Sequence, residues 1–126
     1  MLSSIRLANI NWELMRLQLN TSHPEKNRVE AFLRAFSDPL EQIPFTWSSL
    51  KESDRIDDAV RLVNPDGSLT ITIIFIKDYW DATPIAEANF TDDKMRWGQN
   101  GSIMYVVESA DDDQVSEVVS MFAGKE

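Results

Sequence analysis

The sequence predicts an α+β fold in which a mostly antiparallel sheet of five to six strands carries two amphipathic helices, as in a ferredoxin-like or related sandwich. Two strong β-hairpin signals, in residues 58–77 and around Asn100-Gly101, predict the sheet. Apolar stripes with helical spacing near both ends of the chain predict the helices. The 126 residues fit a single α+β domain spanning 1–126, and 43% hydrophobic residues are typical of a globular protein.

Residues 5–20 open the predicted fold with a strand or a helix. Met15, Leu17 and Leu19 alternate with polar residues, as in a half-buried strand. The same segment contains good helix formers, so a helix over residues 10–20 is the alternative. We favour the strand, because the short polar connection at 20–22 suits a strand followed by a helix packed back on it.

Ser22-His23-Pro24-Glu25 predicts a helix start as a capping box, in which the side chain of Ser22 would accept the backbone N–H of Glu25. The stripe that follows has helical spacing and consists of Val29, Phe32, Leu33 and Phe36. Asp38-Pro39 is predicted to end the helix. Because this helix start accounts for His23, the only histidine, we interpret it as structural rather than catalytic.

The segment 37–57 has two prolines and no sustained period, and we expect a long irregular connection with a short strand or edge segment at 45–48. The hairpin of residues 58–77 then turns at Asn64-Pro65-Asp66-Gly67. One face of its second strand is apolar throughout, whereas the other becomes apolar only at Ile74 and Ile76. We expect helices over the first face and, toward Ile76, cover on the second face too.

A polar and aromatic loop at 78–84 is predicted to lead into two strands at 85–90 and 94–99. Asn100-Gly101 then predicts a hairpin between 95–99 and 102–109. The pairs expected in that register are Trp97 with Met104, Arg96 with Tyr105, and Gly98 with Ile103.

The chain is predicted to close with a second amphipathic helix. The acids at 111–113 suit a helix N-terminus, and Gly124 suits its C-terminal cap. Between them lies an apolar stripe made of Val115, Val118, Val119 and Phe122.

The net charge of −9 disfavours nucleic acid as a partner, because a phosphate backbone is bound mainly by lysine and arginine. The same charge is compatible with a cationic small molecule or a basic protein partner, and equally with simple solubility. The sequence shows no signal peptide or membrane span, and it has no cysteine. We therefore expect a cytoplasmic protein with no membrane partner.

No phosphate-binding glycine loop, nucleophile elbow, zinc motif or calcium loop is present, and a lone histidine cannot build a histidine-rich metal site. We expect neither a metal nor a cofactor. Aromatic residues beside acids are more suggestive, because they bind cationic or aromatic ligands. The candidate ligand-binding residues are Trp47, Tyr79, Trp80, Asp81 and Trp97. The same aromatic residues would also fit a homo-oligomer interface or ordinary core.

Three functions remain open on this sequence. The leading hypothesis is a non-catalytic small-molecule-binding or accessory domain, homo-oligomeric through a sheet edge or face, with an aromatic and acidic pocket. An acidic partner-binding protein, like an immunity protein or antitoxin that masks a basic toxin, is the first alternative. The second is a cofactor-independent enzyme that uses a carboxylate such as Asp81 or Asp57 as a general base.

Overall fold

The computed structural model describes residues 19–36 and 39–122, which form a five-stranded sheet with helices on both faces. All four strand pairs are antiparallel, in the order β1-β2-β3-β5-β4. The strands are β1 (Glu41–Ile43), β2 (Ile56–Val63), β3 (Leu69–Ile76), β4 (Met95–Asn100) and β5 (Ile103–Ser109). The α-helices are α2 (Lys26–Arg34), α3 (Ala82–Asn89) and α4 (Asp112–Phe122). The predicted α+β class is confirmed.

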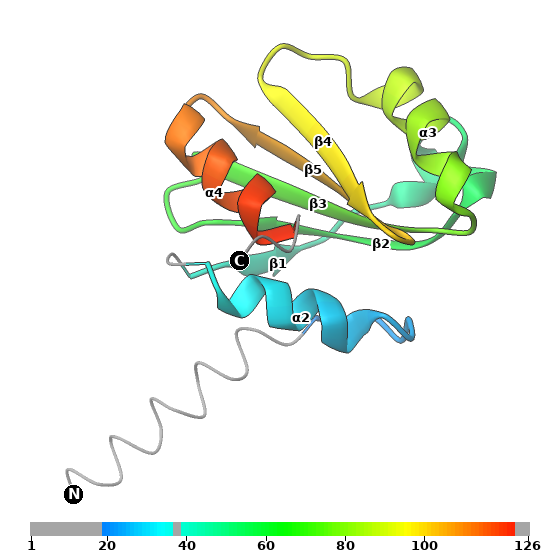
Figure 1. Cartoon of the computed structure of the whole chain (residues 1–126), viewed down its shortest axis with the longest axis horizontal. Coiled ribbons are helices and arrows are strands. Elements are labelled where there is room, and N and C mark those ends of the chain that lie inside the picture. The colour runs from blue at the N-terminus through cyan, green and yellow to red at the C-terminus, as the bar shows by residue number, and fades with distance from the viewer. Residues whose placement is uncertain (1–18, 37–38, 123–126) are drawn as a thin grey trace, which may run out of the picture.

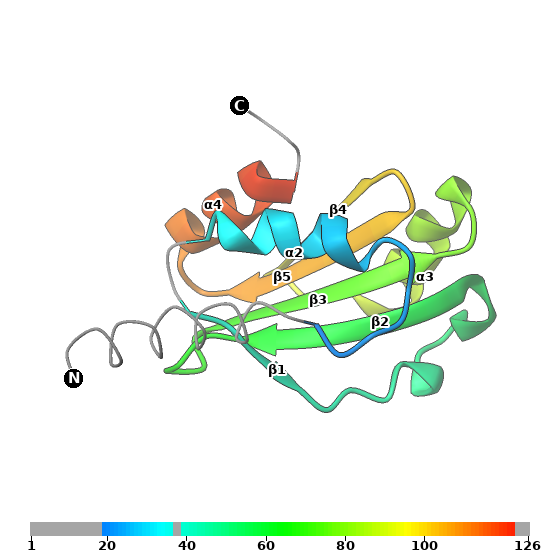
Figure 2. The ribbon, with the colours of Figure 1, turned by 90° about the horizontal axis from the view of Figure 1, so that it is seen from below.

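The helices lie in separate layers. Figures 1 and 2 show α2 and α4 on one side of the sheet and α3 on the other, over one end. Three short 3-10 turns complete the described elements: η1 (Trp47–Ser49), η2 (Ser53–Arg55) and η3 (Tyr79–Asp81). The order from β1 onward, three strands, a helix, two strands and a helix, differs from the β-α-β-β-α-β order of a ferredoxin-like fold. The related sandwich is therefore the better description.

The β2–β3 hairpin explains why both sheet faces are covered. The predicted turn is present, with Gly67 at φ +74°. The apolar face of β3 packs with α2 and α4 in a large buried cluster, whose β3 members are Leu69, Ile71, Ile73 and Phe75. On the opposite face only Ile74 and Ile76 are apolar, and they pack under α3. The expected cover on both faces toward Ile76 is confirmed.

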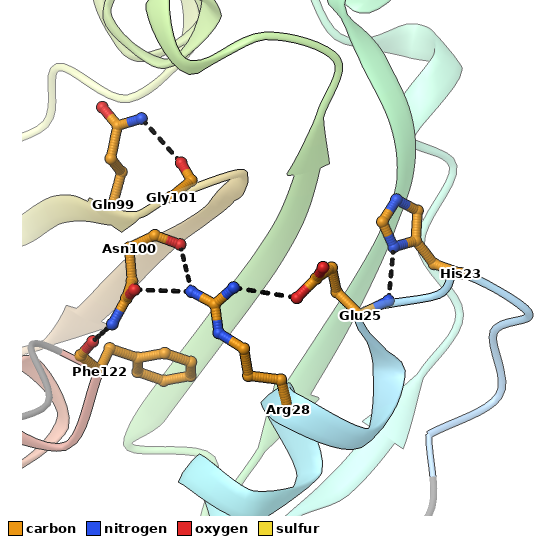
Figure 3. Close-up of polar contacts among 7 residues, drawn as sticks. All are labelled: His23, Glu25, Arg28, Gln99, Asn100, Gly101 and Phe122. Atoms are coloured by element: carbon orange, nitrogen blue, oxygen red, sulfur yellow. Dashed lines mark hydrogen bonds and ion pairs between the residues drawn. The ribbon is translucent and has the colours of Figure 1, made fainter.

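The turn ahead of α2 (residues 23–25) has a different cap from the one the sequence suggested, and the helix itself, from Lys26, has no side-chain cap. The capping box of Ser22 and Glu25 is wrong: the Glu25 N–H donates to His23 Nδ1 at 3.1 Å, and Ser22 is exposed. Figure 3 shows this bond. The imidazole is held from two further sides, because it stacks on Phe75 at 4.2 Å and its Nε2 lies 3.7 Å from Asp57 Oδ2. The imidazole of His23, fixed in this way, accepts the hydrogen bond from the Glu25 N–H that the Ser22 hydroxyl was expected to accept.

We expect Ser22→Ala to change the free energy of unfolding by less than about 0.5 kcal/mol, because Ser22 contributes no cap. His23→Ala should cost about 1–2 kcal/mol through the lost cap and the lost ring stacking. Urea unfolding of the two variants beside the wild type measures both values. If Ser22→Ala lowered the free energy of unfolding more than His23→Ala does, the capping box of Ser22 and Glu25 would be supported after all.

Arg28 of α2 ties three elements together (Figure 3). Its Nη2 donates to the backbone oxygen and to Oδ1 of Asn100, at 2.8 and 2.6 Å, and its Nη1 bonds Glu25 Oε1 at 2.9 Å. Asn100 Nδ2 in turn donates to the carbonyl oxygen of Phe122, at the last residue of α4. The turn between β4 and β5 is therefore fixed to both helices of the first face.

The expected strand at 85–90 is wrong, because residues 85–89 belong to α3 and Phe90 follows the end of this helix. Asp78 and Asp81 form a capping box around η3, which leads directly into the helix. Pro84 stands in the first turn, where a missing N–H costs nothing. The buried residues Ala82, Ile85 and Ala86 have spacings of three and four, which is a helical period. A third helix thus joins the two that were predicted.

The edge strand also lies elsewhere than expected. Residues 45–48 are not a strand; β1 precedes them at Glu41–Ile43, and Pro44 separates the two segments. The predicted strand at 5–20 falls almost wholly outside the described residues, and Leu19 and Asn20 belong to no strand. The predicted stripes of α2 and α4 are confirmed, since Val29, Leu33, Val118 and Phe122 are all buried.

The β4–β5 hairpin is confirmed, but its register is shifted by two residues. Gly98 pairs with Tyr105, Arg96 with Val107 and Trp97 with Val106. The loop consists of Gly101 and Ser102, with Gly101 at φ +64°, so Asn100 closes the ladder instead of opening the turn. A shift of two leaves each side chain on its expected face.

Candidate functional site

Large exposed apolar side chains gather beside η3 and β4. In the part of the chain that the structure describes, these are Trp80, Tyr79 and Trp97, with 78%, 57% and 38% of their surface exposed. Tyr79 and Trp80 meet edge to face, with ring centroids 5.3 Å apart. We call Tyr79, Trp80 and Trp97 the aromatic corner.

The 3-10 turn η3 and the strand β4 are held together by a side chain. Gln99 Nε2 donates to the carbonyl oxygen of Tyr79 at 2.8 Å and to that of Gly101 at 3.1 Å. Gln99 and Trp97 are two residues apart, so both side chains lie on the α3 face of β4. The aromatic corner therefore combines the start of α3 with the last strand of the sheet.

Asp81 belongs to the same turn, but its carboxylate is engaged within the fold. Its Oδ1 accepts Arg55 Nη1 at 2.7 Å, and its Oδ2 accepts the backbone N–H of Asp78 at 3.0 Å. Its side chain is 10% exposed. Hydrogen bonds from Arg55 to Glu52 and to Asp81 raise the pKa of Arg55, because both acids stabilise its charged form. This arrangement is that of a helix cap and a structural ion pair.

Trp47 lies apart from the aromatic corner. It belongs to η1, which contacts β2, and it packs against the buried cluster under α3. Strands β3 and β5 separate β2 from β4, a lateral distance of about 14 Å at the usual strand spacing. The structure thus places three of the five predicted residues on an exposed surface beside η3 and β4, engages Asp81 within the fold, and leaves Trp47 beside β2.

Among the described strands, β4 lies at one edge of the sheet. The Ser109 N–H donates to the carbonyl oxygen of Lys94, which makes these two a hydrogen-bonded pair. Because such pairs alternate in an antiparallel ladder, the backbone groups of Trp97 and Gln99 point away from β5. Trp97 therefore offers both an exposed ring and an outward-facing backbone.

Sequence reasoning missed Arg55 and Gln99, which organise this corner. Neither carries a local signal, because each acts on a residue more than 15 positions away: Arg55 on Asp81 and Gln99 on Tyr79. Among the residues that the structure describes, no group of three acidic or histidine side chains could hold a metal ion. Nor does any described helix have the length and apolar character needed to cross a membrane.

Comparison with family models, with curated proteins and with solved structures finds no match to this chain. The functional argument therefore depends on its own geometry.

Proposed function

We propose that this chain is a non-catalytic accessory domain that binds proteins and forms a homodimer through the aromatic corner. The observation that carries the proposal is the gathering of Tyr79, Trp80 and Trp97 beside the outer edge of β4. Tryptophan and tyrosine are enriched in protein interfaces and supply much of their binding energy. An exposed strand edge is itself a template for pairing with another chain.

A second copy of the chain suits this surface. In a two-fold dimer the same surface patch lies on both sides of the interface. The outward backbone groups of Trp97 and Gln99 can pair with their counterparts, while Trp80 and Tyr79 bury apolar surface beside them. Such pairing would cover the exposed rings and satisfy the free edge at the same time.

The small-molecule and enzyme hypotheses have less support. A cationic ligand or a general base would need a carboxylate that faces the ligand, but both oxygens of Asp81 accept hydrogen bonds within the fold. The remaining aromatic side chains are widely exposed, whereas small-molecule sites usually bury most of the ligand in a concave pocket. Protein contact uses an exposed aromatic surface directly.

The test is the effect of Trp80→Ser on the mass of the protein in solution. Because Trp80 is 78% exposed, we expect its replacement to leave the free energy of unfolding of one chain within about 0.5 kcal/mol of its normal value. We expect it to weaken dimerisation at least tenfold, as removal of an interface tryptophan does. Sedimentation equilibrium over a concentration series measures the dissociation constant.

Arg34→Ser is the matched control, since it also shortens a large exposed side chain but lies on α2, across the sheet. Its dissociation constant should equal that of the wild type. If Trp80→Ser and the wild type had equal dissociation constants, the aromatic corner would not be the dimer interface.

A further inference from the structure

Half of the sheet face that carries α3 has no α-helix over it in the described residues. Helix α3 packs on Ile74 and Ile76, near the end of β3. Figure 1 shows α3 over one end of the sheet, whereas the strands continue away from it toward the β2–β3 turn. Two rows of paired residues cross all five strands there. The inner row is Ile43, Arg61, Thr72, Val106 and Trp97; the outer row is Glu41, Val63, Thr70, Glu108 and Met95. We call these two rows the open half-face.

Five of the ten residues in the open half-face are apolar, and they come from every strand except β3: Ile43, Val63, Val106, Met95 and Trp97. Thr72 and Val106, in the middle of the inner row, are buried, whereas the rest of the surface is incompletely covered. Ile43, Val63 and Met95 are half-buried, and Trp97 is exposed at its β4 end. Phe45 lies beside it, with its ring 3.9 Å from the guanidinium carbon of Arg61. A sheet surface of this kind gains free energy when a further apolar element packs on it.

The charge around the open half-face is mainly negative. Glu41 and Glu108 stand in its outer row. The β2–β3, α3–β4 and β5–α4 loops at this end of the sheet add exposed acids: Asp66 after β2, Asp92 and Asp93 before β4, and Asp111 after β5. Lys94 and Arg96 are nearby, on either side of Met95 in the sequence. Because side chains alternate between the two faces along a strand, Arg96 lies on the face of the sheet opposite to Met95.

Arg61 is the one positive charge within the two rows, and neighbouring groups already partner it. Its Nε donates to Thr72 Oγ1 at 3.0 Å, its guanidinium lies over Phe45, and Glu108 attracts it. Burial lowers the pKa of Arg61, opposed by Glu108. The charge of Arg61 is therefore directed to Thr72, Phe45 and Glu108. It does not neutralise Glu41 or the acids of the loops.

We propose that the open half-face binds an amphipathic helix of a protein partner, with an apolar stripe against the sheet and lysine or arginine residues toward the acidic loops. This inference names the partner class of the proposed accessory domain, and it rests on that protein-binding function but not on the dimer. A basic amphipathic helix matches both the apolar residues of the two rows and the surrounding acids. A second copy is the poorer occupant, because stacking two such faces would bring like charges together.

The probe is an 18-residue Leu/Lys peptide whose leucines recur at helical spacing. The controls are a scrambled peptide of equal composition and a Leu/Glu peptide of the original pattern. Titration by tryptophan fluorescence or calorimetry should show saturable binding of the patterned Leu/Lys peptide only. If the net charge of −9 alone attracted the peptide, the scrambled peptide would bind as tightly as the patterned Leu/Lys peptide. That result would overturn the inference.

Two charge-reversal variants locate the site. Glu41→Lys changes an exposed residue of the outer row, and Asp54→Lys makes the same change at the exposed η2, near the opposite end of β2. Glu41→Lys should weaken binding of the Leu/Lys peptide about fivefold, whereas Asp54→Lys should change it less than about twofold. Equal effects of the two variants would contradict the assignment to the open half-face.

The same titration on Trp80→Ser separates this inference from the dimer. Trp97 belongs to both surfaces, so a monomeric variant should bind the peptide at least as tightly as the wild type does, and that result would support the open half-face independently of dimerisation. A wild-type dimer that binds none of the peptides would overturn the open half-face and leave the aromatic corner as the interface.

Discussion

Asp81→Ala should lower the free energy of unfolding by about 1–2 kcal/mol, although Asp81 lies next to exposed aromatic residues. The change removes the side chain that accepts the Asp78 N–H, and it leaves Arg55 without its buried partner. Both losses act where η3 leads into α3, the helix that covers one end of the second sheet face. Urea unfolding followed by circular dichroism measures the effect.

Glu52→Ala is the matched control, because Glu52 pairs with the same Arg55 through a 2.8 Å contact. The Glu52 side chain is 42% exposed, against 10% for Asp81, so solvent screens its ion pair. We expect Glu52→Ala to cost less than about 0.5 kcal/mol. If Asp81→Ala were as mild as Glu52→Ala, Asp81 would not be a structural cap, and a ligand-binding role would again be favoured.

Gly98→Ala should destabilise the fold by about 1–3 kcal/mol, because its added methyl group would overlap a core side chain. A Cβ at Gly98 would lie 2.3 Å from Tyr105 Oη and 2.5 Å from Tyr105 Cζ. The tyrosine ring cannot easily retreat, since it stacks on Phe122 with centroids 4.8 Å apart. Thermal unfolding should show a midpoint lowered by several degrees.

A double-mutant cycle with Tyr105→Ala tests the stated cause. Once the ring is absent, Gly98→Ala should cost nothing, because alanine is otherwise better than glycine in a strand. The same cost in both backgrounds would show that contact with Tyr105 is not the reason for a glycine at position 98.

The β2–β3 hairpin and the stripes of α2 and α4 could be predicted because their signals are local. Each element is defined within about ten residues, either by a Pro-Asp-Gly turn or by apolar residues that recur every two positions in a strand and every three to four positions in a helix. The prediction failed at residues 85–90, where a strand was expected. The capping box of Asp78 and Asp81 was the stronger signal, and it turned the same residues into α3.

The register of the second hairpin and the cap ahead of α2 depended on tertiary contacts. Arg28 holds Asn100 in the ladder, which moves the turn onto Gly101 and Ser102. His23 caps the turn ahead of α2 because Phe75, from the middle of the sheet, supports its ring. Neither partner lies within reach of a local sequence pattern.

The candidate site was predictable in part for the same reason. Exposed aromatic residues in a loop after the central strand pointed to Tyr79 and Trp80, and the second hairpin pointed to Trp97. The engagement of Asp81 by Arg55 and the position of Trp47 beside β2 depend on tertiary contacts and could not be read from residue types.

The most direct test of the proposed interface is the mass of the wild-type protein in solution. Light scattering coupled to size exclusion should give about twice the 14.4 kDa of one chain at micromolar concentration, with tryptophan emission shifted to shorter wavelength as Trp80 becomes buried. A mass of 14.4 kDa at every concentration up to the millimolar range would contradict the homodimer.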